Sequence, residues 1–278
     1  MIGSIFCICL HELRRVAHTG RMQTSPAIPR NPRFGYAKSA GWRARIGFLI
    51  PPGTPTAERE MVELAPDGVS VHFARMVARG PVGTLSSLLE RAASHVEHLD
   101  EVVEMLASVK PHVIVLAHTA TSYYLGKERE AELVARIQER TGIPFITTFG
   151  SVLAACRELR VQTVAVGTAY DEALSRRSRE VLESHGLTVA NMQWLPDVKS
   201  IFEETEERVY HLGRQVDRPE AQAVFISGVG LPTLSVLGAL EADLGKPAIS
   251  SAACMMWQAL RIARVQAPVA GYGRLLET

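Results

Sequence analysis

Short apolar runs rich in β-branched residues alternate along the chain with stretches of helical periodicity. The runs lie at 45–50, 69–73, 112–117, 144–148, 163–168, 188–194, 222–227 and 247–250. Continuous runs of this length are typical of parallel strands that are buried on both faces. Between them, apolar residues recur every three or four positions, as from Leu85 to Val103, which predicts amphipathic helices. Eight strands alternating with helices predict an α/β protein with parallel sheets.

The pattern occurs twice. Each copy contains a strand, a small polar loop, a helix, a Gly-x-Pro triplet, a second strand and a pair of hydroxyl residues. The matching segments are 112–121 with 223–233 and 141–148 with 244–251, and the openings 45–52 and 163–170 also correspond. An internal repeat of this kind predicts two pseudo-symmetric α/β halves with a ligand site in the cleft between them. We assign 44–148 plus 250–278 to the first half and 149–249 to the second.

Residues 1–43 differ from the rest of the chain. They contain one acidic residue, Glu12, against seven lysines and arginines, and Pro26, Pro29 and Pro32 interrupt any helix. We expect this segment to lie outside the fold, as a flexible or mis-annotated leader. An Arg-rich, acid-poor leader is also compatible with a transit sequence.

Composition narrows the classes of partner. Of the 278 residues 47% are hydrophobic, and the formal net charge of +1 gives no support for binding nucleic acid or an anionic membrane. No apolar run reaches the roughly 18 residues that would span a bilayer. The four cysteines, Cys7, Cys9, Cys156 and Cys254, lack paired metal-ligand spacing, so we expect no metal site and a cytoplasmic location. A small molecule is the expected partner, and the oligomeric state stays open.

Four loops follow strands whose carboxyl ends should meet at one cleft. In open parallel sheets ligands bind beyond these ends, where loop hydroxyls and free amide N–H groups can receive an anion. None of the loops has the glycine spacing of a phosphate-binding P-loop. The candidate binding residues in the loops are Pro51, Pro52, Thr119, Thr121, Ser122, Tyr170, Ser227, Gly228, Val229 and Gly230.

His118 is the candidate acid or base, because it directly follows a buried strand and an imidazole exchanges protons near neutral pH. A lone histidine is also often structural. Tyr170 can offer its phenol to a carboxylate, or it can be an amphipathic residue at a domain seam. For Ser122 and Thr233, ordinary helix capping is the alternative interpretation.

Several motifs together resemble a known family. They are IGFLIPP at 46–52, the loop at Thr119, VAVGTAY at 164–170, ISGVGLPTL at 226–234, PAISS at 247–251 and GYGRL at 271–275. Over 45–278 the chain resembles the arylmalonate decarboxylase and maleate isomerase branch of the aspartate/glutamate racemase superfamily. The resemblance implies cofactor-independent chemistry at the α-carbon of a small carboxylic or dicarboxylic acid, through an enolate-like intermediate. It assigns the holding of the carboxylate to the hydroxyls of Thr119 and Tyr170 and to backbone N–H groups near Val229 and Gly230.

The sequence departs from the family at the positions of its catalytic cysteines. Racemases of the superfamily carry two cysteines and the decarboxylases one, whereas this chain has His118 and Gly228 there. Ala120 also replaces a serine of the decarboxylases. We therefore expect a decarboxylase-like enzyme that uses His118 as proton donor or acceptor. A maleate isomerase-like or racemase-like isomerase and an inactive carboxylate-binding homologue remain alternatives.

Overall fold

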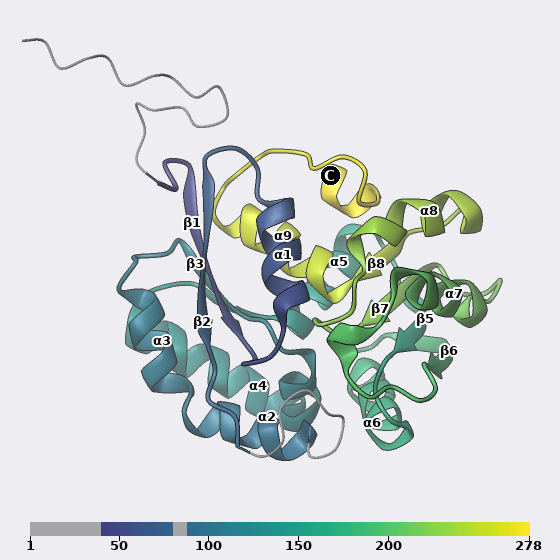
Figure 1. Ribbon diagram of the computed structural model, residues 1–278, viewed down its shortest axis with the longest axis horizontal. Coiled ribbons are helices and arrows are strands. Elements are labelled where there is room, and N and C mark those ends of the chain that lie inside the picture. Colours follow the sequence, from purple (N-terminus) through teal and green to yellow (C-terminus); the bar gives the residue numbers. More distant parts are fainter. Residues whose placement is uncertain (1–39, 80–87) are drawn as a thin grey trace, which may run out of the picture. The chain divides into compact units, whose positions relative to one another are not determined.

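Two four-stranded parallel sheets with the same strand order organise the structure (Figure 1). The computed structural model describes residues 40–79 and 88–278. The first sheet has the order β2-β1-β3-β4 and the second β6-β5-β7-β8. The first sheet consists of β1 (Ala44–Ile50), β2 (Val69–Arg75), β3 (Val113–Leu116) and β4 (Phe145–Thr147). The second consists of β5 (Thr163–Thr168), β6 (Thr188–Trp194), β7 (Ala223–Ser227) and β8 (Ala248–Ser250).

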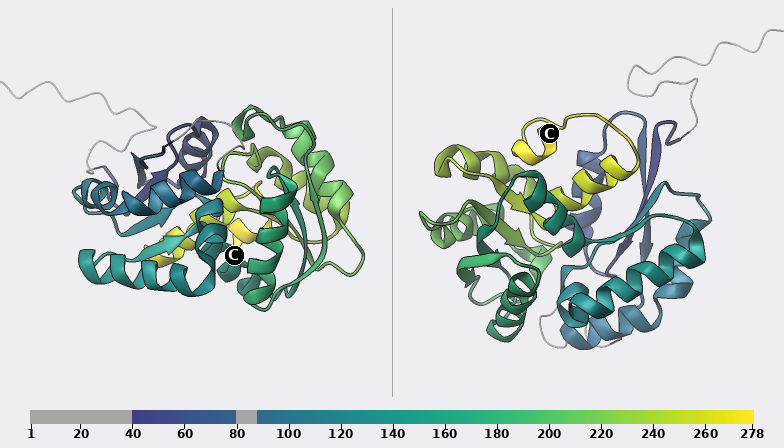
Figure 2. Two further views of the ribbon diagram at one scale, coloured as in Figure 1. Left: turned by 90° about the horizontal axis from the view of Figure 1, so that it is seen from below. Right: turned by 180° about the vertical axis from the view of Figure 1, so that it is seen from behind.

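Helices cover both sheets, and α5 and α9 lie between them (Figures 1 and 2). The helices beside the first sheet are α1 (Pro55–Leu64), α2 (Leu88–Glu97), α3 (Leu99–Ala107) and α4 (Thr119–Thr141). The others are α5 (Thr148–Glu158), α6 (Glu172–Ser184), α7 (Glu206–Val216), α8 (Leu234–Leu244) and α9 (Ser251–Ile262). The predicted α/β class and all eight predicted strands are confirmed.

The repeat extends to the helix ends. Gly142 and Gly245, the first residues of the two Gly-x-Pro triplets, end α4 and α8 with left-handed backbones at φ 67° and φ 69°. Each donates its N–H to the carbonyl four residues earlier, at 2.9 Å. This is the helix-ending conformation that glycine favours. Thr147 and Ser250, the last residues of β4 and β8, cap α5 and α9 with their side chains.

Three predictions about segments need qualification. The segment from Leu85 to Val103, which was predicted as one helix, contains two: α2 ends at Glu97 and α3 begins at Leu99. Leu85 lies outside the described residues. Residues 1–39 of the predicted leader, with Cys7 and Cys9, also lie outside them. Residues 39–278 form one compact unit, so the division into halves at 148 and 250 stays a prediction. Within the described ranges, no helix has the length and apolar character needed to cross a membrane.

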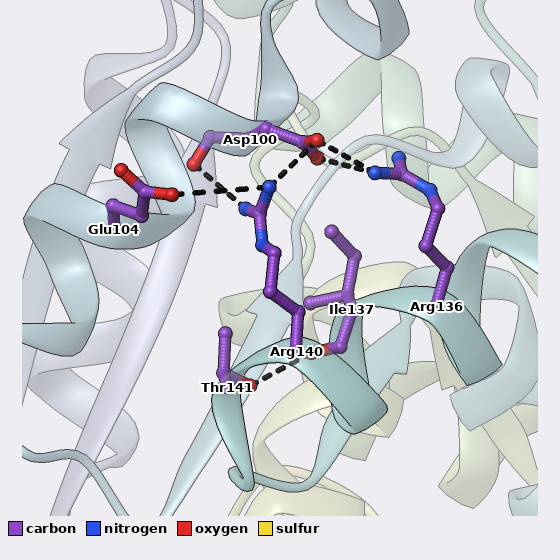
Figure 3. A network of polar contacts seen from close by, with 6 residues as sticks. All are labelled: Asp100, Glu104, Arg136, Ile137, Arg140 and Thr141. Atoms are coloured by element: carbon purple, nitrogen blue, oxygen red, sulfur yellow. Dashed lines mark hydrogen bonds and ion pairs between the residues drawn. The ribbon is translucent and has the colours of Figure 1, made fainter.

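An ion-pair network fastens the C-terminal turns of α4 to α3 (Figure 3). Asp100 Oδ2 lies 2.6 Å from Nη1 of both Arg136 and Arg140. Arg140 Nη2 also donates to the carbonyl of Asp100 at 2.9 Å, and its Nη1 lies 3.9 Å from Glu104. A network of several charges holds better than an isolated surface pair. It keeps α4 fixed at the end opposite the candidate site.

Glu60 on α1 connects the first sheet's helices to the second. Its Oε1 accepts hydrogen bonds from the amides of Thr233 at 2.7 Å and Leu234 at 3.1 Å, where α8 begins. Its Oε2 is buried and has no partner among the described residues. Burial raises the pKa of this carboxyl from 4.5 to about 7, although the two amide bonds oppose the shift. Folding therefore favours the protonated acid.

Replacing Glu60 by Gln should flatten the pH dependence of stability. Because the pKa is higher in the folded than in the unfolded state, the stabilisation is complete below pH 4.5 and is lost as the pH rises through 7. The shift corresponds to about 3 kcal/mol of unfolding free energy. Urea unfolding at several pH values between 5 and 8 measures it. Glu101→Gln, at an exposed position of α3, should keep the wild-type dependence of the unfolding free energy on pH. The same dependence in Glu60→Gln would contradict the raised pKa of Glu60.

Candidate functional site

A cavity lies at the carboxyl ends of β1, β3, β5 and β7. Its volume is about 70 Å³, well below the roughly 300 to 1,000 Å³ of sites for drug-sized ligands. Every one of the four loops singled out in the sequence contributes to its wall. The candidates that line it are Pro51, Pro52, His118, Tyr170, Val229 and Gly230.

Other candidate residues lie behind this wall in a buried hydroxyl cluster. Ser251 Oγ lies 3.1 Å from Thr119 Oγ1 and accepts a hydrogen bond from the amide of Gly228, also at 3.1 Å. Ser227 Oγ lies 2.9 Å from the phenol oxygen of Tyr123. All five residues are buried. The cluster therefore joins the loop after β3, the loop after β7 and the start of α9.

Tyr170 connects this cluster to the cavity. The side chain is 3% exposed. Burial raises the pKa of the phenol to about 12, against the opposing effect of the nearby hydroxyls of Thr119 and Ser227. Tyr170 is followed by Asp171, whose side chain caps α6 by accepting the amide of Leu174 at 2.8 Å. The phenol is thus a neutral hydrogen-bond donor in a fixed place.

His118 stands between β3 and α4, with an extended backbone at φ −153°. Its Nδ1 lies 2.8 Å from Thr121 Oγ1, which leaves Nε2 as the ring nitrogen available to a bound molecule. The ring meets that of His95 edge-on, with 4.9 Å between centroids. Burial, followed by the charges of His95 and Arg91, lowers the pKa of His118 well below 6.5. At neutral pH the imidazole is therefore uncharged and can accept a proton.

The loop after β7 supplies backbone donors. Gly228 has φ +134°, a conformation that residues with side chains rarely adopt. The next two amides, of Val229 and Gly230, form no hydrogen bond within the part of the chain that the structure describes. Both residues line the cavity. An anion in the cavity can accept hydrogen bonds from such amides.

Ser122 and Thr233 make contacts away from the cavity wall. Ser122 Oγ donates to Glu130 Oε1 at 2.5 Å, and burial raises the pKa of that carboxyl. Thr233 Oγ1 donates to Ser250 Oγ at 2.9 Å. Neither hydroxyl caps a helix, and neither residue lines the cavity. A binding role for Ser122 stays a prediction and would require its hydroxyl to leave Glu130.

The sequence analysis did not single out two ionisable residues that line the cavity, Arg91 and His95. Both lie on α2 and are buried, with 8% and 2% of their surface exposed. Their spacing of four residues places them on one helix face. This spacing is the sequence feature that could have indicated a shared site. Periodicity alone does not show which face of a helix lines a cavity.

The two described cysteines lie away from this wall. Cys156 and Cys254 are buried elsewhere, and burial raises the pKa of Cys156 to about 12. No cysteine is among the described residues that line the cavity. Across residues 40–79 and 88–278 there is also no group of three or more metal-ligating His, Cys, Asp or Glu side chains.

Comparison with known proteins assigns the family. The arylmalonate decarboxylase family model matches residues 46–276. The chain belongs to the arylmalonate decarboxylase family. Its relatives include the arylmalonate decarboxylase of Bordetella bronchiseptica, 28% identical over 84% of this chain and 96% of that protein. The maleate isomerase of Nocardia farcinica is 26% identical over 84% of this chain and 95% of that protein.

Solved structures of similar proteins share the fold. A variant of the Nocardia farcinica maleate cis-trans isomerase with a covalently bound succinylcysteine intermediate superposes with a TM-score of 0.77 at 26% identity, covering 84% of this chain and 98% of that one. An arylmalonate decarboxylase superposes with a TM-score of 0.69 at 25% identity. The superposition covers 84% of this chain and 100% of that one. The resemblance stated from the sequence is thereby confirmed. The relatives are enzymes, which supports an enzymatic role for this family member.

Replacing Ser251 by Ala should destabilise the fold. The change leaves the buried amide of Gly228 without its acceptor and removes a partner of Thr119. A buried donor left unpaired costs about 1–3 kcal/mol. Urea unfolding at pH 7 measures the loss. As a control, Ser108→Ala removes an exposed hydroxyl and should keep the free energy of unfolding within about 0.5 kcal/mol of wild type. Equal losses in the two variants would argue against the bridging role of Ser251.

Proposed function

We propose that this family member is a cofactor-independent enzyme that transfers a proton at the α-carbon of a small carboxylic acid, through an enolate-like intermediate. The observation that carries the proposal is the position of His118, which lines the same cavity as Tyr170. An acid or base and a hydrogen-bond donor for the developing negative charge are the two groups that such a reaction needs. His118 thus takes the role that cysteine has in the family.

The carboxylate that becomes the enolate would be held by neutral donors. Tyr170 offers its phenol, and the amides of Val229 and Gly230 offer N–H groups from the facing loop. Thr119 would act mainly by orienting Tyr170, because its own hydroxyl is buried and bonded to Ser251. Fixed donors that meet charge as it develops are worth about 3 kcal/mol each in the barrier.

Decarboxylation is the simplest form of the proposal. The bond between the α-carbon and the departing carboxylate breaks, CO₂ leaves, and the electron pair stays on the α-carbon. It delocalises into the retained carboxylate as an enediolate. His118, protonated at Nε2, then gives that proton to the α-carbon and recovers one from solvent. The product is a monocarboxylic acid when the substrate is a malonate.

Isomerisation or racemisation is a second candidate, and the protonation state of His118 favours it. Because the pKa of His118 lies well below 6.5, the free protein presents a neutral imidazole at pH 7. A neutral imidazole takes the α-proton first and returns it to the other face or to a neighbouring carbon. Decarboxylation instead requires the ring to gain a proton before the step, for example when an anion binds.

Replacing His118 by Asn should slow turnover strongly while ligand binding persists. Phenylmalonate, methylmalonate and maleate are incubated in deuterium oxide and followed by NMR for CO₂ loss, isomerisation and α-deuteration. General acid–base catalysis contributes about 10²- to 10⁴-fold, so kcat should fall by that factor. His211→Asn, an exposed histidine on α7, is the matched control. Unchanged turnover in His118→Asn would remove the histidine from the mechanism. If the wild type turns over no acid of an extended carboxylate panel, the protein only binds carboxylates and the enzymatic proposal fails.

The pH profile separates the two reaction forms. If neutral His118 accepts the proton, kcat/KM should stay level from pH 8 to below 6.5 and fall only at more acid pH, because its pKa is lowered. If protonated His118 must donate, kcat/KM should instead rise as the pH falls through the same range. Steady-state rates between pH 4.5 and 8.5 on the substrate identified above make the measurement.

A further inference from the structure

Thr121 lies behind His118 and not in the cavity wall. It occupies the first turn of α4, is fully buried, and is not among the described residues that line the cavity. Its amide donates to the carbonyl of His118 at 3.1 Å, and its Oγ1 lies 2.8 Å from His118 Nδ1. Any effect of Thr121 on a bound molecule therefore passes through the ring of His118.

The contact between Thr121 and His118 has one direction that leaves no buried hydrogen unpaired. The hydroxyl has a single hydrogen, and among the described residues His118 Nδ1 is the only acceptor with which it forms a hydrogen bond. If Nδ1 instead carried a proton and donated it, the hydroxyl hydrogen would be buried without an acceptor, which is unfavourable. The hydroxyl of Thr121 therefore donates, and Nδ1 accepts.

A ring that accepts at Nδ1 carries its proton on Nε2, because a neutral imidazole has one N–H group. The surroundings agree with a neutral ring. Burial, followed by the electrostatic effects of His95 and Arg91 on α2, lowers the pKa of His118 well below 6.5. Since His118 lines the cavity and Thr121 occupies Nδ1, the group that the ring offers to a ligand is Nε2–H.

His95 provides a contrast in the same cavity wall. Its Nδ1 lies 2.7 Å from the carbonyl oxygen of Val77, and because a carbonyl can only accept, this Nδ1 carries the proton. Burial lowers the pKa of His95 to about 4, so at neutral pH the ring is uncharged and its Nε2 is bare. The rings of His95 and His118 meet edge-on, with 4.9 Å between centroids. The two histidines thus have opposite tautomers, and the partner of Nδ1 decides each of them.

We propose that Thr121 is a positioning residue that holds neutral His118 in its Nε2–H tautomer, so that the ring presents a hydrogen-bond donor, and not a lone pair, to the bound acid. The inference deepens the proposed function and rests on it for the identity of the ligand. A carboxylate oxygen can accept a hydrogen bond from Nε2–H directly.

The tautomer distinguishes the two reaction forms. Before Nε2 of the neutral ring can take an α-proton, the ring proton has to move to Nδ1, and the hydroxyl of Thr121 then loses its acceptor. Thr121 therefore opposes the isomerisation form, which the neutral state of the ring alone would favour. Decarboxylation requires no such shift, because the proton that it delivers to the α-carbon is already on Nε2.

NMR of the imidazole nitrogens reads the tautomer directly. Long-range ¹H–¹⁵N correlation spectra of the full, ligand-free chain at pH 7.5 distinguish protonated from bare ring nitrogens, and the signals of His118 are those missing from His118→Asn. Wild type should show Nε2–H in about 5- to 150-fold excess over Nδ1–H, which is the cost of an unpaired buried hydroxyl expressed as a ratio. His95, identified in the same way with His95→Asn, should show the reverse pattern.

Three threonine variants separate the hydroxyl from the rest of the side chain. Thr121→Ser keeps the hydroxyl and should keep the wild-type tautomer. Thr121→Val keeps the volume but removes the donor, and should lower the Nε2–H excess at least about fivefold. Thr188→Val, at an exposed position of β6, should leave the ring of His118 unchanged. A purely structural role of Thr121 would alter stability in Thr121→Val without moving the chemical shifts of the ring nitrogens.

Three results would each overturn the inference. They are Nδ1–H as the main tautomer of His118 in wild type, protonation of both ring nitrogens at pH 7.5, and an unchanged tautomer ratio in Thr121→Val. If Thr121→Val does not fold, as judged by circular dichroism, Thr121→Ala removes the same donor and carries the comparison with Thr121→Ser.

The proposed function can fail separately, because the tautomer is measured in the ligand-free protein. An Nε2–H tautomer that depends on Thr121, without turnover of any acid, would support the role of Thr121 in a protein that only binds. Turnover that depends on His118, together with a bare Nε2 in the free protein, would support the enzyme and reject the inference.

Discussion

The hydroxyl of Ser251 is the contact on which the candidate site depends. It bridges Thr119, after the third strand of the first sheet, to the amide of Gly228, after the third strand of the second. Because these groups are buried, each needs a partner inside the protein, and only this arrangement of the two sheets supplies them. The bridge therefore fixes the distance between two loops that belong to different copies of the repeat.

The cavity that results separates two kinds of polar group. Tyr170 provides a neutral phenol that burial keeps protonated, and Arg91 provides a charge that burial does not remove. Burial first of all, and then the electrostatic effects of His95 and Arg91, lower the pKa of His118 well below 6.5, so its imidazole is neutral at pH 7. In the proposed reaction, an anionic substrate would raise the pKa of His118, and substrate binding would then be coupled to proton transfer.

Family membership fits this chemistry, and the differences are local. The fold covers nearly the whole length of the decarboxylase and isomerase relatives. At the two positions where the resemblance implies cysteine, His118 has a side chain held by Thr121, and Gly228 has a backbone that few other residues would adopt. The first change replaces a thiol by an imidazole, while the second leaves only backbone donors on that side of the cavity.

The sequence by itself determined the eight strands, their parallel class and the four loops that line the cavity. These follow from local periodicity and from the rule that parallel strands end at one edge, so distant contacts are not needed. Only the tertiary structure decided that Arg91 and His95 face the cavity, that Ser122 turns to Glu130 and that Ser251 bridges the sheets. Which face of a helix is turned inward, and which hydroxyl finds which partner, depends on the packing of elements far apart in the chain.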